Sequence, residues 1–186
     1  MHEIKPLILN SIIIVICILS SVIDVKTKKI PNVLTFGGAI VGIIINTVNH
    51  GASGFFLSVL AYIIAVLIMV ALDPKHKVGY GDVKLMACIG AFIGPKLILI
   101  TWFFYALIFG SFAIIRIAGA LPWLKLMGDF IVANQTKQPF VLNFDKTKLN
   151  MVLKSRVSLA PFIALSLIFT LVFGETILQA MFNNAG

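Results

Sequence analysis

Asp82 and Asp24 are the residues of this sequence best suited to catalysis. Asp82 lies in the stretch Gly79–Lys84 (GYGDVK), at the start of a long apolar run, and Asp24 follows the apolar run 7–23. An acid beside such a run is costly unless it is paired or hydrated, so these residues mark functional sites. Two adjacent carboxyl groups that share one proton can hydrolyse a peptide bond, because one takes a proton from water while the other donates to the scissile carbonyl. The two aspartates are therefore a candidate catalytic pair.

The composition places these acids in a membrane protein. Of the 186 residues, 60% are hydrophobic and 12% are charged, and the mean hydropathy is +1.06, which is too apolar for a soluble domain of this size. We expect one membrane domain, 1–186. The net charge is +8, but the basic residues cluster in short loops between apolar runs. This pattern indicates contact with membrane lipids and not with nucleic acid.

The apolar runs predict an all-α integral membrane protein. A bilayer core is crossed by about 20 helical residues, and six segments fit this length. They are 6–23, 32–49, 54–72, 80–94, 96–116 and 157–175. The pairs Gly38/Gly42 and Gly90/Gly94 have the small-xxx-small spacing that lets helices pack closely. Near the segment ends, Tyr80, Trp102 and Tyr105 are expected to be interfacial anchors.

The distribution of basic residues predicts the orientation. The loops after the first, third and fifth segments hold thirteen of the fifteen Lys and Arg residues, which places these loops in the cytoplasm and both termini outside. Asp24 ends the first segment and Asp82 begins the fourth, so both acids meet at the cytoplasmic face. The long loop 117–156 is expected to be cytoplasmic and partly interfacial.

The neighbours of the two acids are candidate site-shaping residues. Gly79 and Gly81 permit positive φ and close backbone approach, so an extended peptide could lie against this turn. Asn32 and Lys84 could orient or polarise the acids, or they could be a helix cap and a lipid-facing base. Non-catalytic interpretations remain open for the acids too, with Asp82 as a helix N-cap and Asp24 as a partner of the following lysines.

A metal or disulfide role is not expected. The three histidines are scattered along the chain and cannot supply a three-ligand metal set. Both cysteines, Cys17 and Cys88, lie inside apolar runs and outside any CxxC pair, so we expect them to be packing residues. We expect no cofactor.

Three stretches resemble the type IV prepilin peptidases and preflagellin peptidases, the GxGD aspartic proteases of the membrane. They are Asp24–Asn32 (DVKTKKIPN), Gly79–Ala87 (GYGDVKLMA) and Ser158–Leu165 (SLAPFIAL). The resemblance implies that Asp24 and Asp82 are catalytic. It also marks Pro31, Asn32, Gly79, Gly81, Lys84 and Pro161 as motif residues that bind substrate or shape the site.

The resemblance also implies the reaction and its place. The substrates would be prepilin-like proteins, such as type IV pilins, pseudopilins or flagellin-like proteins, whose short basic leader is cleaved at the cytoplasmic face of a prokaryotic plasma (inner) membrane. Larger members carry an N-terminal domain with paired CxxC motifs that methylates the new N-terminus. This sequence has no CxxC pair, so we expect peptidase activity without methyltransferase activity.

Three other functions fit the sequence less well. In a small ion-coupled transporter or channel, the two carboxylates would bind cations, but the Ile-Pro-Asn and Ala-Pro-Phe elements would have no purpose. A non-catalytic assembly subunit would not need both acids. Presenilin-like proteases share GxGD, but their other aspartate lies deep in an apolar helix, whereas three lysines closely follow Asp24. The substrate, the assembly system, the acid and base roles, gating by loop 117–156 and the oligomeric state stay open.

Overall fold

The computed structural model describes residues 6–72, 79–120, 131, 134 and 157–183. The chain divides into two compact units. The first comprises Met1–Ile108 with Ser158–Gly186 and holds both aspartates, and the second comprises Phe109–Val157. Each unit is considered by itself.

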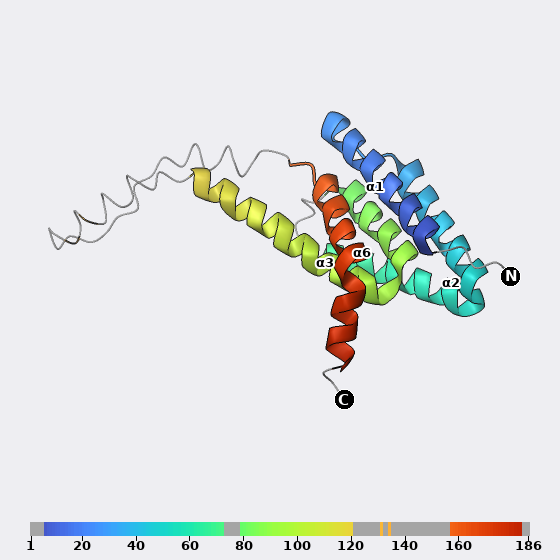
Figure 1. Ribbon diagram of the computed structural model, residues 1–186. Coiled ribbons are helices and arrows are strands. Elements are labelled where there is room, and N and C mark those ends of the chain that lie inside the picture. Colours follow the sequence, from blue (N-terminus) through green and yellow to red (C-terminus); the bar gives the residue numbers. More distant parts are fainter. Residues whose placement is uncertain (1–5, 73–78, 121–130, 132–133, 135–156, 184–186) are drawn as a thin grey trace. The chain divides into compact units, whose positions relative to one another are not determined.

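Helices make up nearly all of the described chain (Figure 1). In chain order they are α1 (Pro6–Thr27), the π-helix η1 (Val33–Gly37), α2 (Gly38–Leu72), α3 (Tyr80–Ala120) and α6 (Ala160–Asn183). The all-helical prediction is therefore confirmed for this part of the chain. Within it, four helices are long and apolar enough to cross a membrane, and these are Ile8–Thr27, Val33–Leu72, Tyr80–Gly119 and Ala160–Ala180.

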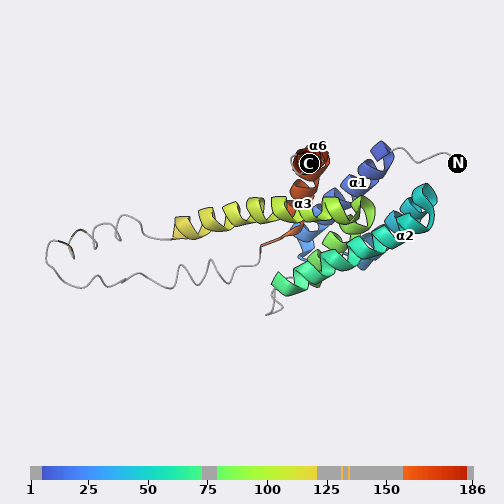
Figure 2. The ribbon, with the colours of Figure 1, turned by 90° about the horizontal axis from the view of Figure 1, so that it is seen from below.

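Two of these four helices are broken in the middle by a glycine. Gly51 has φ 62° and ψ −144°, and Gly94 has φ 79° and ψ 176°. Positive φ is strained for residues with a Cβ, so glycine suits both positions. A straight helix of 40 residues would be about 60 Å long, roughly twice the thickness of a bilayer core. Figures 1 and 2 show that α2 and α3 change direction along their length, and both breaks fall at predicted segment boundaries. Six membrane crossings remain a prediction.

A side chain of α2 caps the break in α3. The carbonyl of Ala91 would normally accept a hydrogen bond from the residue four positions on, but that residue is Pro95, which has no N–H. The Nδ2 group of Asn46 supplies the missing donor, at 2.9 Å from the Ala91 oxygen and 3.0 Å from the Phe92 oxygen. This contact ties the two broken helices together.

Small residues let the helices of the first unit pack closely. A methyl group added at Gly42 would lie 2.7 Å from Phe92, and one added at Gly90 would lie 2.7 Å from the carbonyl oxygen of Ala61. The predicted packing role is therefore confirmed for these glycines, and for Gly38, which faces the buried Cys88. The free cysteines Cys17 and Cys88 are both buried, as predicted for packing residues.

The packing prediction is wrong for Gly94. A methyl group added there would meet no atom within 4 Å, so the residue serves the turn and not a helix contact. The backbone conformation at this position is what calls for glycine, because φ is 79°. The four-residue spacing from Gly90 therefore does not mark a shared packing face.

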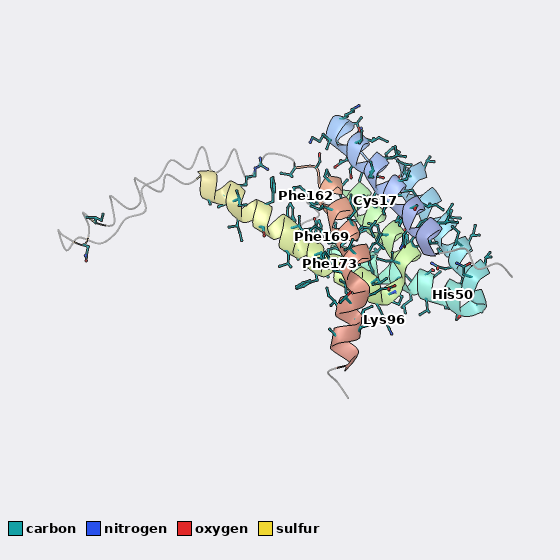
Figure 3. All side chains as sticks on the ribbon, in the orientation of Figure 1. Cys17, His50, Lys96, Phe162, Phe169 and Phe173 are labelled. Carbon is teal, nitrogen blue, oxygen red and sulfur yellow. The ribbon has the colours of Figure 1, made fainter. Side chains whose placement is uncertain are left out.

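Aromatic residues join α6 to the second half of α3 in the first unit. Figure 3 shows Phe162, Phe169 and Phe173 along α6, and the ring of Phe169 lies 5.7 Å from that of Phe104. Trp102 and Tyr105 were predicted to be interfacial anchors, but both are buried and their rings meet edge to face at 5.6 Å. That prediction is wrong because the chain turns at Gly94 and brings this part of α3 into the core.

In the second unit, the described residues are mainly the end of α3. Arg116 lies over the ring of Phe112, with 6.0 Å between the guanidinium carbon and the ring centroid. Residues 117–120 of the predicted cytoplasmic loop 117–156 belong to this helix. Nearly all of the remaining loop lies outside the described residues, so its interfacial character stays a prediction.

Candidate active site

Asp24 lies in the last turn of α1 and is only 6% exposed. The helix ends because Lys28 adopts a left-handed conformation with φ 54°, and its backbone N–H donates to the Asp24 carbonyl at 2.8 Å. This is the usual way to close a helix C-terminus, although glycine is the common residue at that position. The hydroxyl of Thr27 supports the same turn, 2.9 Å from the carbonyl oxygen of Ile23.

Asp82 lies in the first turn of α3 and is 8% exposed. The carbonyl of Gly79 accepts the backbone N–H of Asp82 at 3.0 Å and that of Val83 at 3.4 Å. A methyl group added at Gly79 would lie 3.0 Å from Oδ2 of Asp82. The absence of a side chain at Gly79 therefore leaves room for the aspartate carboxyl group.

The positive φ that Gly79 and Gly81 permit is not used. Neither has it, because both belong to a turn that leads directly into a right-handed helix. Close approach does occur at Gly81, where an added methyl group would lie 3.1 Å from Cβ of Ile30. This glycine allows the Ile-Pro-Asn stretch to pack against the start of α3.

Asn32 and Lys84 connect the two aspartate-bearing stretches. Nζ of Lys84 donates to Oδ1 of Asn32 at 3.0 Å and lies 4.8 Å from the ring centroid of Phe36. Asn32 precedes η1, but its side chain makes no capping hydrogen bond. The helix-cap interpretation of Asn32 is therefore wrong, and its amide instead joins the region after α1 to the first turns of α3. Pro31, next to Asn32, helps this turn form by accepting the N–H of Leu34 at 3.1 Å.

Ser158 brings the third motif to the same region. Nζ of Lys28 donates to the Ser158 hydroxyl at 2.7 Å, and this hydroxyl donates to the Asp24 carbonyl at 3.4 Å. The start of α6 is thereby tied to the end of α1. Pro161 follows in the first turn of α6 and is partly buried, a position where its missing N–H costs nothing.

The roles of Ser158 and Lys28 were missed from the sequence. Both residues lie in the motif stretches, but nothing in the spacing of a lysine run and a distant serine signals a contact between them. The sequence indicates only that Lys28 is a charge near Asp24, whereas its ammonium group binds Ser158.

The two carboxyl groups interact electrostatically. They lie close enough for the charge of Asp24 to act on Asp82. Oδ2 of Asp24 and Oδ1 of Asp82 are buried without a hydrogen-bond partner among the described residues. A buried carboxylate oxygen without a partner is costly, so the pair is suited to sharing a proton and to receiving a polar ligand such as water. No cluster of three Asp, Glu, His or Cys residues forms in the described part of the chain.

The fold and the site define a helical membrane protein in which two carboxyl groups are buried at the candidate site. Residues 11–115, more than half of the sequence, match the model of the type IV leader peptidase family. The chain belongs to this family and is a protease. The matched range includes both aspartates and ends before Ser158. The comparisons with curated proteins and with solved structures gave no match.

Proposed function

We propose that this chain is an aspartic endopeptidase that removes the short basic leader of prepilin-like proteins at the cytoplasmic face of a prokaryotic plasma membrane. The observation that carries the proposal is the pair of buried aspartates, each with one carboxyl oxygen that has no partner among the described residues. Membership of the leader peptidase family supports the substrate class.

The two aspartates would divide the chemistry between them. The ionised carboxylate takes a proton from water as the water oxygen attacks the carbonyl carbon, and the protonated carboxyl donates to the carbonyl oxygen. The tetrahedral intermediate then collapses, the C–N bond breaks and the leaving amine gains a proton. Because the site works with one proton, cleavage should have a bell-shaped pH dependence that belongs to the pair.

Recognition of the leader by charge is not favoured. The side chains of Lys26, Lys28 and Lys29, in the last turn of α1 and just after it, are all exposed, and their charge would repel a basic leader. Binding is better explained by contact between the substrate's apolar helix and the enzyme's helices, together with a small residue at the cleaved bond.

The test is cleavage of a co-expressed prepilin-like protein by wild type and by Asp24→Asn and Asp82→Asn. Each substitution keeps the size of the side chain and removes its acid–base function, so we expect cleavage to fall by at least about a hundredfold. Glu175→Gln is the matched control, because this acid is exposed on α6. The proposal fails if either aspartate variant accumulates in the membrane and still cleaves fully.

A further inference from the structure

The buried polar atoms without partners extend beyond the aspartates. In the described part of the chain, four buried side-chain N or O atoms have no hydrogen-bond partner. Two are the carboxyl oxygens of Asp24 and Asp82, and the others are Oγ of Ser20 and Nε1 of Trp102. Proteins keep few such groups, because each loses its hydration without compensation. The proposed hydrolysis does not use the last two.

Ser20 differs from the other helical hydroxyls around it. It lies one turn before Asp24 on the same side of α1 and is 0% exposed. A buried hydroxyl in a helix usually donates to a carbonyl of the preceding turn. Ser21 does so to Cys17 at 2.7 Å, as does Thr101 to Leu97 at 2.9 Å. The Ser20 hydroxyl has no such bond.

The second unpaired group, Trp102, lies in the half of α3 that follows the break at Gly94. The chain turns at Gly94. Asp82 lies before this turn and Tyr105 lies after it, at nearly the same number of residues, so the two residues lie at a similar distance from the turn along the helix axes. Trp102 lies about one turn closer to Gly94, and its ring meets Tyr105 edge to face at 5.6 Å. It is 7% exposed. The electrostatic effect of Asp82 on Tyr105 agrees with this placement.

We propose that Ser20 and Trp102 bind the main chain of the substrate polypeptide, one helical turn deeper than the aspartates. The inference rests on the proposed function. A polypeptide must be extended at the cleaved bond, which leaves its own N–H and C=O groups without partners in an apolar environment. The indole N–H of Trp102 can only donate, so it would bind a peptide carbonyl, whereas the Ser20 hydroxyl can donate or accept.

The test compares Ser20→Ala and Trp102→Phe with wild type in cleavage of a synthetic peptide that carries a basic leader and an apolar segment. Loss of one hydrogen bond to bound substrate should raise KM about three- to tenfold and leave kcat within about twofold. Thermal stability of Ser20→Ala should not fall, because the variant removes a group that is unpaired in the free enzyme. Trp102→Phe also removes packed ring atoms and should lower stability somewhat, so its KM is measured at a temperature where both proteins are fully folded.

Two control variants separate binding from packing. Ser21→Ala removes a hydroxyl that is already bonded within α1, and Phe103→Leu removes an exposed aromatic ring from α3, so both should keep the wild-type KM. The inference is overturned if KM is unchanged in both test variants. It is also overturned if kcat falls while KM stays the same, which would assign the two groups to the attacking water.

A binding measurement keeps this inference separate from the proposed function. If wild type does not cleave the peptide, the proposed function fails, and the affinity of the fluorescently labelled peptide is then compared directly. Weaker binding to Ser20→Ala and Trp102→Phe than to wild type supports the inference. Equal affinity, or no binding to wild type, overturns it.

Discussion

Asp24 and Asp82 are buried to nearly the same extent, but different kinds of contact hold them in place. Asp82 depends on its immediate neighbours, since the carbonyl of Gly79 closes its turn and the missing Gly79 side chain leaves space for its carboxyl. Asp24 depends also on Ser158, which reaches the Asp24 carbonyl from the start of α6. One half of the site is therefore built locally, and the other is completed by a distant part of the chain.

The largest effect is expected from crowding the carboxyl group of Asp82, in the locally built half of the site. Gly79→Ala places a methyl group 3.0 Å from Oδ2 of Asp82, so the carboxyl must move. The required shift is a few tenths of an ångström, whereas a displacement of about 1 Å can cost up to about a hundredfold in rate, so we expect kcat to fall about tenfold with little loss of thermal stability. Gly110→Ala is the control, because an added methyl group there meets nothing within 4 Å. Full activity in Gly79→Ala would contradict the local account of Asp82.

A smaller effect is expected from breaking the distant contact. Ser158→Ala removes the hydroxyl that joins Lys28 to the Asp24 carbonyl, and the lost positioning should lower kcat about three- to tenfold. Ser158→Thr keeps a hydroxyl and should retain most of the activity, whereas a purely structural role would give both variants the same activity at matched stability. Lys29→Ala, at an exposed neighbouring lysine, is the control. If Ser158→Ala costs more than Gly79→Ala, the ranking of the two halves is wrong.

The smallest effect is expected where the two halves are joined. Asn32→Ala and Lys84→Ala each break the 3.0 Å hydrogen bond between the two stretches. Because the pair is exposed, a double-mutant cycle on thermal unfolding should give a coupling of no more than about 1 kcal/mol. Additive effects of the two substitutions would show that this bond does not couple the halves.

The contrast between the surroundings of Asp24 and Asp82 also explains which features could be predicted from the sequence. The apolar runs predict helices, and the acids beside them stand out because a membrane chain holds few. The setting of Asp82 is contained in a short contiguous motif, so Gly79 could be identified even though it does not adopt the positive φ that a glycine permits. The contact of Lys28 with Ser158 joins residues far apart in the chain, and no local pattern encodes it. The prediction that Trp102 is an interfacial anchor failed for the same reason, because its surroundings depend on the turn at Gly94.

The π-helix η1 determines how Asn32 is rotated about the helix axis relative to the packed residues that follow η1. Val33–Gly37 separates Asn32, which binds Lys84, from Gly38 and Gly42, which pack on Cys88 and Phe92. Each residue of an α-helix turns its successor by about 100°, and the wider π-helix turns it by somewhat less. Inserting or deleting one residue in this segment would therefore leave the downstream packing intact and swing Asn32 away from Lys84. The length of this five-residue segment is thus constrained independently of which side chains it carries.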